Sequence, residues 1–405
     1  MVHVSDAKDE NHDILNALRK SVRDEPESGI VNAANYVWKL GREAIPMWVG
    51  EGSEPTPEFI CRAAVDALAR GETFYTHQRG IPELRNALAS YHERHYGKPF
   101  DAENFYVTVG GMGAIQIAVQ AVAEAGSEIV IPSPAWPNYA APMRMHQVTP
   151  VEVPMRFANG TWHIDLDRLL GAVTDKTRAI AINSPSNPVG SVVGDEELIA
   201  IRDFCRNKGI WIIADEVYHR FFYPVKPGAG AIAPSFQNHC DAEEQVIYVN
   251  TFSKNWAMTG WRMGWMQAPQ AMGQKIENLI QYNTSGVPSF MQPAGVTALN
   301  EGEDFVAKQV AHCKEGLDIV LSTLGRRNDI AYQRPEGAFY YFFKVDGIED
   351  STAAIRTWID EIGVGLAPGT AFGPGGESWF RMCYAGAHED LRTACERLSG
   401  WLDRR

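Results

Sequence analysis

The sequence has few cysteines and no spacing that would build a disulfide framework or a zinc site. Its 405 residues contain 6 cysteines, which lie far apart without a C-x-x-C pair or a histidine at ligand spacing. We therefore expect no metal site, and free thiols in a reducing compartment. The cysteines are Cys61, Cys205, Cys240, Cys313, Cys383 and Cys395.

An excess of positive charge is also lacking. Lysine and arginine together number 37 against 50 aspartates and glutamates, which gives a formal net charge of −13. Such a chain has no electrostatic footprint for binding nucleic acid or an anionic membrane surface. Local cations must therefore hold any anionic substrate.

Long uninterrupted apolar runs are missing as well. Two uncharged stretches, residues 105–123 and 278–300, are long enough to raise the question of a membrane span. Glycines interrupt the first, and prolines and amides interrupt the second, so we expect neither to cross a bilayer. The opening residues, MVHVSDAKDENHD, lack the basic start and apolar core of a signal peptide. We expect a cytoplasmic protein.

The composition is that of an ordinary globular protein, with 45% apolar and 21% charged residues. Short apolar strands alternate with helical stretches from about Phe105 onward. Several strands are apolar at nearly every position, which is typical of a parallel sheet covered on both faces. The pattern predicts an α/β fold with a mostly parallel open sheet. The expected strands are 105–109, 128–131, 179–183, 210–214 and 246–250, and the expected helices between them include 113–125 and 195–207.

A second, smaller α+β domain is expected after about residue 300. A long amphipathic helix (304–324), aromatic strand material (338–345) and a final helix (389–402) follow one another there. We predict an N-terminal arm that joins this small domain over residues 1–49, a large α/β domain over residues 50–300, and the small domain over residues 301–405. In the large domain, Asp195 is the expected N-cap of helix 195–207, and Gly209 lies just past its end.

Polar and glycine residues follow the predicted strands, where ligands of open α/β sheets bind. Gly110-Gly-Met-Gly-Ala114 opens a helix after the first strand, and its free backbone N–H groups would bind an anion such as a phosphate. A dinucleotide fingerprint would need glycine where Gln116 stands and an acidic residue after the next strand, and both are absent. The glycines could also serve only a tight turn.

Residues whose side chains could take part in catalysis or ligand binding follow three further strands. Asp215 follows a buried strand, where it could pair with a ring nitrogen or simply cap a helix. Asn187 lies in a proline-rich turn, where asparagine is common for structural reasons alone. Lys254 follows another apolar strand, directly after the hydroxyl residues Thr251 and Ser253 and eight residues before Arg262. Together these groups fit one ligand, pyridoxal phosphate: a phosphate site, a carboxylate for the pyridine nitrogen, and a lysine for the aldehyde.

The sequence resembles the class I/II aminotransferases of fold type I, the pyridoxal-phosphate family that includes aspartate aminotransferase. The resemblance extends from about Gly29 to the C-terminus. Its most specific motifs are Asn187-Pro-Val-Gly190, Ala214-Asp-Glu-Val-Tyr218, Ser253-Lys-Asn-Trp-Ala-Met-Thr-Gly-Trp-Arg262 and Trp379-Phe-Arg381.

The resemblance implies a role for each matching residue. Lys254 would form the Schiff base and carry the proton, Asp215 would hold the ring nitrogen protonated, and Asn187 and Tyr218 would donate to the ring's phenolic oxygen. Trp136 would stack on the ring. The residues implied for the phosphate are Gly111, Met112, Thr251, Ser253 and Arg262, with Tyr75 reaching the cofactor of a neighbouring subunit in a homodimer with shared active sites.

For the substrate, the resemblance implies that Arg381 grips the α-carboxylate, assisted by the backbone at Gly50, with Trp136 and Asn187 nearby. The expected reaction is a ping-pong exchange of an amino group between an L-amino acid and a 2-oxo acid. The amino donor stays open: Met112 and the segment 282–286 offer no second cation for a dicarboxylate, and arm residues such as Asn32 or Asn35 could shape the pocket. A C–S β-lyase with the same cofactor is an alternative. A regulatory protein is a remote one, because only 49 residues precede Gly50 and they carry no basic recognition helix.

Overall fold

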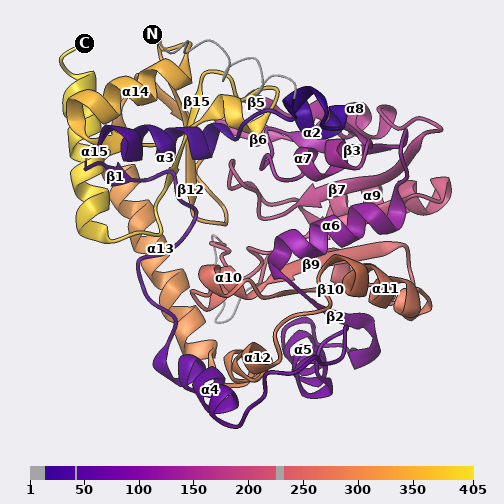
Figure 1. Cartoon of the computed structure of the whole chain (residues 1–405). Coiled ribbons are helices and arrows are strands. Elements are labelled where there is room, and N and C mark those ends of the chain that lie inside the picture. Colours follow the sequence, from indigo (N-terminus) through magenta and orange to yellow (C-terminus); the bar gives the residue numbers. More distant parts are fainter. Residues whose placement is uncertain (1–13, 42, 225–231) are drawn as a thin grey trace, which may run out of the picture.

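The computed structural model describes residues 14–41, 43–224 and 232–405. Figure 1 shows a large sheet covered by helices on one side of the molecule and a small sheet with long helices on the other. Among the described residues no helix is both long and apolar enough to cross a membrane. All six cysteines are free thiols, as the sequence predicts.

The large sheet has seven strands in the described residues, in the order β2-β10-β9-β8-β7-β3-β4. Strand β10 runs antiparallel to both of its neighbours, and the other pairs are parallel. The sheet is therefore mostly parallel, as predicted. The strands are β2 (Phe105–Thr108), β3 (Glu128–Ser133), β4 (Thr149–Pro154), β7 (Thr177–Asn183), β8 (Trp211–Asp215), β9 (Val246–Thr251) and β10 (Gly264–Gln267).

Helices cover both faces of the large sheet because its strands present apolar side chains alternately to each face. In β3, Ile129 and Ile131 belong to the core on one face and Val130 to the core on the other. The helices in the first core are α6 (Gly110–Val122), α7 (Ala140–Met145) and α11 (Gly273–Asn283), and those in the second are α8 (Leu166–Gly171) and α9 (Asp195–Lys208). A third core lies beside β2, under α4 (Glu58–Ala69), α5 (Pro82–Tyr96) and α12 (Gln292–Glu301).

Two helix ends in this layer differ from the sequence prediction. Helix α6 begins at Gly110 rather than Gly113. In α9, Gly194 is the N-cap and Asp195 is already helical, so the predicted cap was wrong by one residue. The backbone N–H of Gly194 is instead held by the Glu197 carboxylate at 3.0 Å. The end of α9 at Gly209, with a φ of 66°, agrees with the prediction.

The small sheet is antiparallel, with the strand order β11-β12-β15-β14. The long helix predicted from residue 304 is α13, and it packs along α15. The elements are β11 (Ile330–Tyr332), β12 (Tyr340–Val345), β14 (Ala367–Pro368), β15 (Trp379–Cys383), α13 (Glu303–Thr323), α14 (Ser351–Ile362) and α15 (His388–Leu402). The hairpin of β5 (Arg156–Ala158) and β6 (Thr161–His163) lies near this sheet, and Trp162 packs on Trp379.

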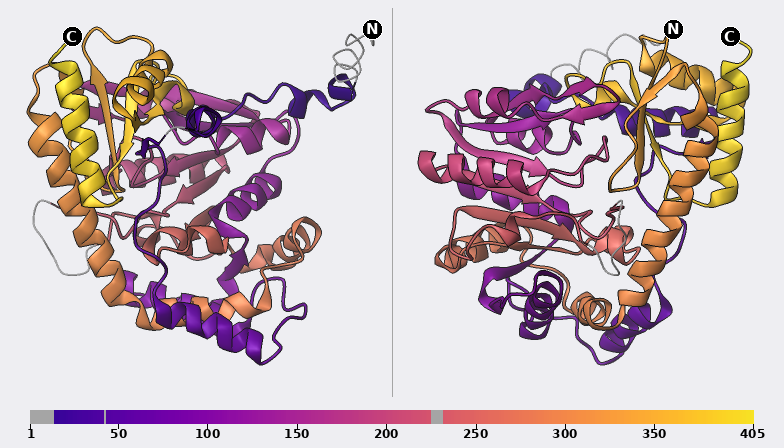
Figure 2. Two further views of the ribbon diagram at one scale, coloured as in Figure 1. Left: turned by 60° about the vertical axis from the view of Figure 1, so that its left-hand side comes forward. Right: turned by 180° about the vertical axis from the view of Figure 1, so that it is seen from behind.

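The N-terminal arm contacts both the helices of the large sheet and the elements of the small sheet. Helix α2 (Lys20–Arg23) contacts α7, whereas α3 (Gly29–Leu40) contacts α14 and β14. After α3, β1 (Ile45–Pro46) pairs in parallel with β13 (Val364–Gly365). Figure 2 shows the arm crossing from the helices of the large sheet to the small sheet. We keep the division at residues 49 and 300 as a proposal.

Candidate active site

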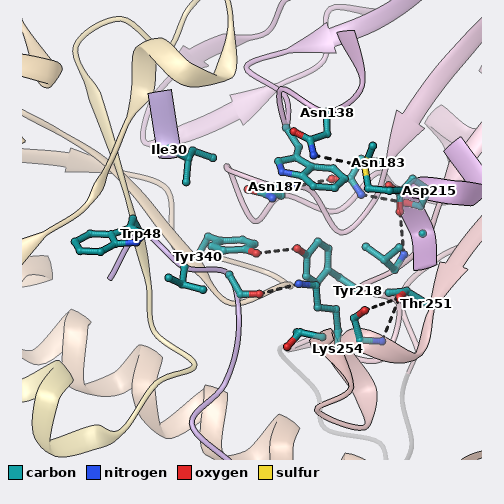
Figure 3. Close-up of a pocket in the computed structure, with 18 of the residues that line it drawn as sticks. Ile30, Trp48, Asn138, Asn183, Asn187, Asp215, Tyr218, Thr251, Lys254 and Tyr340 are labelled. Carbon is teal, nitrogen blue, oxygen red and sulfur yellow. Dashed lines mark hydrogen bonds between the residues drawn. The ribbon is translucent and has the colours of Figure 1, made fainter. Parts of the chain in front are cut away.

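A cavity of about 500 Å³ lies where the strand ends of the large sheet face the arm and the small sheet. The N-terminal arm, the large domain and the small domain all contribute residues to its lining, and Figure 3 shows many of these residues. All predicted cofactor and substrate residues except Tyr75 line it. The lining consists of Ile30, Val31, Ala34, Trp38, Trp48, Val49, Gly50, Gly111, Met112, Ile115, Trp136, Asn138, Asn183, Asn187, Asp215, Val217, Tyr218, Thr251, Ser253, Lys254, Thr259, Arg262, Tyr340 and Arg381.

Lys254 lies in α10 (Phe252–Asn255), a single helical turn directly after β9. The turn forms there because the Thr251 side chain accepts a hydrogen bond from the Ser253 backbone N–H at 3.1 Å. Lys254 Nζ donates to the carbonyl oxygen of Gly50 at 2.7 Å. Burial lowers the pKa of Lys254 from 10.5 to about 8, and Arg381 and Arg262 act in the same direction. A sizeable fraction of the lysine side chains is therefore neutral near physiological pH, although the ammonium form still predominates.

Asp215 ends β8 and is only 1% exposed. Burial raises the pKa of its carboxyl from 3.8 to about 7, although the Val217 N–H and Lys254 pull the pKa down. Asp215 Oδ1 accepts from the Val217 backbone N–H at 3.1 Å, which is the bond of a cap, but a turn rather than a helix follows. A buried carboxylate in this setting calls for a cationic partner from the cavity.

Tyr218 and Tyr340 form a hydroxyl pair in the middle of the cavity, with their Oη atoms 2.8 Å apart (Figure 3). Both side chains are buried, and burial raises the pKa of each phenol above its ordinary value. The sequence predicts a strand at Tyr340 but gives no sign that its side chain lines the cavity. Alternation along a strand does not reveal which face meets a cavity.

Arg381 lies in β15 and is 2% exposed. Its Nη1 donates to Asn187 Oδ1 at 2.9 Å, and its Nη2 donates to the carbonyl oxygen of Trp48 at 2.5 Å. The guanidinium carbon lies 4.5 Å from the ring centre of Tyr340. The Nε atom is buried and has no hydrogen-bond partner in the described parts of the chain. The guanidinium is thus fixed in place with a donor still available.

The start of α6 and the segment after β9 both contribute to the lining of the cavity. Thr251 Oγ1 donates to Ser253 Oγ at 2.9 Å, and Arg262 Nη1 donates to the Thr259 carbonyl oxygen at 2.7 Å. Gly110 has a φ of 68°, and a Cβ there would approach Arg262 Nη2 to 2.6 Å. Glycine at position 110 therefore leaves room for the Arg262 guanidinium beside the start of α6.

Trp136, Met112 and Asn187 also lie on the lining, as predicted. Two further asparagines, which the sequence did not single out, contact Met112 and Asn187. Asn138 Nδ2 contacts Met112 Sδ at 3.5 Å, and the Asn187 backbone N–H donates to Asn183 Oδ1 at 2.8 Å. Asn183 was expected only as the end of a strand.

Tyr75 is 93% exposed and does not line the cavity of its own chain. Its contact with a second subunit stays a prediction. The expected arm residues Asn32 and Asn35 do not line the cavity either. The arm contributes apolar residues of α3 instead, and these had no signal in the sequence.

Comparisons with known proteins identify the family of the chain and relatives that cover most of its length. Residues 44–398 match the family described as Aminotransferase class I and II. An aspartate aminotransferase of Pyrococcus horikoshii is 34% identical over 89% of this chain and 91% of that protein. Aromatic-amino-acid aminotransferase 2 of Thermococcus litoralis is 33% identical over 87% of this chain and 90% of that protein. The solved structure of an aspartate aminotransferase from Thermotoga maritima is similar with a TM-score of 0.87 at 29% identity, covering 95% of this chain and all of that one.

Proposed function

The chain belongs to the class I and II aminotransferase family, and we propose that the cavity described above is its active site. The protein is a pyridoxal-phosphate-dependent enzyme of fold type I, which moves an amino group between an amino acid and a 2-oxo acid by a ping-pong mechanism. One observation carries the assignment of the site: Lys254, Asp215 and Arg381, from three different strands or strand ends, face one cavity.

The residues present fit the cofactor. Asp215 is a buried carboxylate that needs a cationic partner, and a protonated ring nitrogen would supply it. At the start of α6, the N–H groups of Gly111 and Met112 would hold the phosphate together with the side chains of Thr251, Ser253 and Arg262. We assign the face of the ring to Trp136 and the ring's phenolic oxygen to Asn187 and Tyr218.

Bound pyridoxal phosphate supplies an aldehyde and an electron-withdrawing ring, which together allow the Cα proton of an amino acid to be removed. The Lys254 amine would take that proton and return it, because its lowered pKa makes it a base near neutral pH. Arg381 would bind the α-carboxylate through its free donors and so fix the orientation of Cα. Tyr340 would position Tyr218 through the hydroxyl contact.

We also propose a homodimer, formed partly by the segment that carries Tyr75. Phe74, Tyr75 and Tyr282 are each more than four-fifths exposed. Their segments adjoin one another, since Gln78 Nε2 donates to Gln281 Oε1 at 2.7 Å. Exposed aromatic rings on adjoining segments are typical of interaction surfaces.

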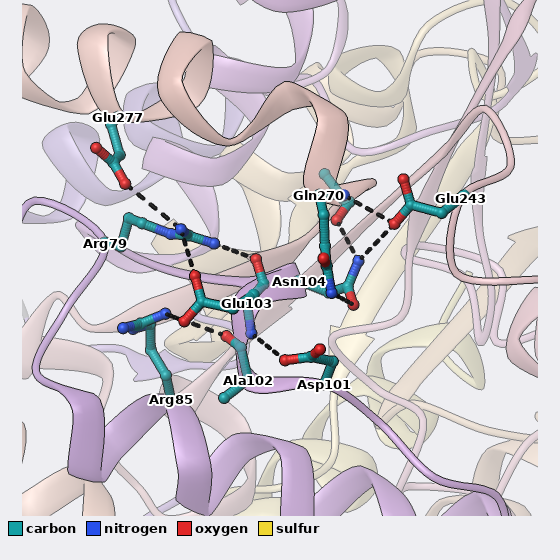
Figure 4. Close-up of polar contacts among 10 residues, drawn as sticks. Arg79, Arg85, Asp101, Ala102, Glu103, Asn104, Glu243, Gln270 and Glu277 are labelled. Carbon is teal, nitrogen blue, oxygen red and sulfur yellow. Dashed lines mark hydrogen bonds and ion pairs between the residues drawn. The ribbon is translucent and has the colours of Figure 1, made fainter.

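The Tyr75 segment is firmly anchored on its own chain, which suits a residue that reaches a neighbour. Arg79 pairs with Glu103 at 2.7 Å and with Glu277 at 3.5 Å, and Arg85 pairs with Glu103 at 2.7 Å (Figure 4). Sedimentation of the wild-type enzyme should show a dimer. A Tyr75→Ala variant should remain dimeric but bind the cofactor more weakly, and an unchanged cofactor affinity would contradict the shared site. The six unpaired thiols support a reducing, cytoplasmic location.

The test of the active site combines a variant with chemical trapping. Borohydride reduction of the cofactor-loaded enzyme, followed by peptide mapping, should label Lys254. A Lys254→Arg variant should form no 2-oxo acid from any amino acid, whereas Lys275→Arg, an exposed lysine of α11, should behave like the wild type. Label on another lysine would overturn the assignment. Pyruvate and ammonia released from cystathionine without an acceptor acid would instead indicate the lyase.

A further inference from the structure

The end of the cavity away from Asp215 is apolar. In Figure 3, Ile30 and Trp48 lie at one end of the cavity and Asp215 and Thr251 at the other, with the tyrosine pair between them. Four residues of α3 line this end: Ile30, Val31, Ala34 and Trp38. Ala34 lies four residues from both Ile30 and Trp38 and three from Val31, so it neighbours all three on the helix surface.

Helix α3 is held in place by its other contacts, so this face is a fixed part of the cavity. Ala33 and Val37 are buried in the core of the small sheet. At the helix start, a Cβ on Gly29 would lie 2.9 Å from Ala371 Cβ, which shows how closely the helix approaches its neighbour. Ser28 caps the helix by accepting from the Val31 backbone N–H at 3.4 Å.

The charged side chain that the described lining brings to this end is Arg381, whose Nη2 donates to the Trp48 carbonyl oxygen. The cations on the lining are Lys254, Arg262 and Arg381, and the proposed function assigns them to the aldehyde, the phosphate and the α-carboxylate. Met112 stands at the helix start without charge. A second substrate carboxylate at this end would lose its water and gain no further cation from the described lining of its own chain, which is unfavourable.

We propose that the α3 face, with Trp48, is the side-chain subsite of the enzyme and selects amino donors with large apolar or aromatic side chains. This inference rests on the proposed function, because Arg381 must hold the α-carboxylate for the side chain to reach α3. Val31 is 51% exposed and Trp38 is 73% exposed. A bound apolar side chain would remove part of this surface from water, which favours binding.

The first test measures amino donors on the wild-type holoenzyme. We expect kcat/KM to be at least about tenfold higher for L-phenylalanine and L-leucine than for L-aspartate, a ratio within reach of an apolar pocket. L-Alanine serves as the donor that barely touches the subsite. A preference for L-aspartate would overturn the subsite while leaving the aminotransferase intact, whereas failure of every donor would count against the proposed function itself.

The second test measures binding without turnover. 3-Phenylpropanoate and succinate both offer a carboxylate to Arg381 but have no amino group. We expect 3-phenylpropanoate to bind the wild-type holoenzyme at least about tenfold more tightly than succinate, measured by calorimetry or by tryptophan fluorescence. Equal or reversed affinities would overturn the proposal.

Variants of α3 test whether this helix determines the preference for large apolar donors. Ile30→Ala should lower the ratio of kcat/KM for L-phenylalanine to that for L-alanine by about tenfold. Asn32→Ala, on the same helix but outside the cavity lining, should leave the ratio unchanged. A ratio that stays constant in Ile30→Ala would contradict the role of α3, and the wild-type binding comparison decides the matter even if the variant folds poorly.

Discussion

The lowered pKa of Lys254 leads to a sharp prediction about how the cofactor-free enzyme takes up pyridoxal phosphate. Burial disfavours the ammonium form and lowers the pKa from 10.5 to about 8. At pH 7.5, about a quarter of the Lys254 side chains are then neutral, against about one in a thousand for an ordinary lysine. Only the neutral amine attacks an aldehyde. The reactive fraction is therefore about two hundred times larger than that of an exposed lysine.

The rate of covalent attachment should follow this titration. We expect the rate constant to rise between about pH 6 and pH 8.5 and to level off above about pH 9, because at least about nine-tenths of the amine is then neutral. Stopped-flow absorbance of the cofactor, mixed with apoenzyme at constant ionic strength, measures it. A parallel series with Nα-acetyl-lysine corrects for the titration of the cofactor itself and should keep rising to about pH 10.

Two variants sharpen the experiment. Lys254→Arg should show no covalent attachment at any pH. Arg381→Gln removes a cation that lowers the lysine pKa, so its plateau should be reached at higher pH. A wild-type rate that climbs tenfold per pH unit through pH 9 and 10 would refute the reasoning, because the lysine would then titrate like an exposed one.

Three further outcomes follow from contacts in the site. Arg381→Lys keeps the charge but loses the planar pair of donors, so KM for amino acids should rise at least about tenfold while cofactor absorbance stays unchanged; an unaltered KM would contradict the role. Tyr340→Phe leaves the buried Tyr218 hydroxyl without its partner and should lower the free energy of unfolding of the apoenzyme by about 1 kcal/mol in urea titrations. The hydroxyl of Tyr341 has no partner in the described structure, so Tyr341→Phe should leave the free energy of unfolding unchanged. Equal decreases in the two variants would contradict a stabilising contact between Tyr218 and Tyr340. Asp215→Asn should slow the single-turnover half-reaction by about a hundredfold or more, and a near-normal rate would remove its role at the ring nitrogen.

The strands that carry the site could be predicted from the sequence because they are apolar on both faces. The runs that begin near Phe105, Glu128 and Val246 correspond to β2, β3 and β9 within a few residues. Strand β10, by contrast, had no recognisable pattern. Its four residues are all buried, and it is a strand because it pairs with β2 on one side and β9 on the other, which depends on residues far away in the sequence.

The same division holds for the site. Residues such as Asp215 and Lys254 could be found because the ends of neighbouring strands converge on one edge of a sheet. Tyr340 and the α3 residues could not, since they reach the cavity through long-range packing. The pairing of β1 with β13, which are more than 300 residues apart, brings the arm to the small sheet. No local pattern in residues 29–40 predicts that the arm contacts the small sheet.

The segment after β1 also explains how an acidic chain keeps a positively charged site. The two buried cations that it contacts are held by main-chain oxygens: the Trp48 carbonyl accepts from Arg381, and the Gly50 carbonyl accepts from Lys254. A carbonyl fixes a cation without neutralising it, whereas a carboxylate in the same place would cancel its charge. The described lining therefore keeps three cationic side chains against the single carboxylate of Asp215. With a net charge of −13 over the whole chain, this local excess would draw a phosphate and an α-carboxylate into the proposed site.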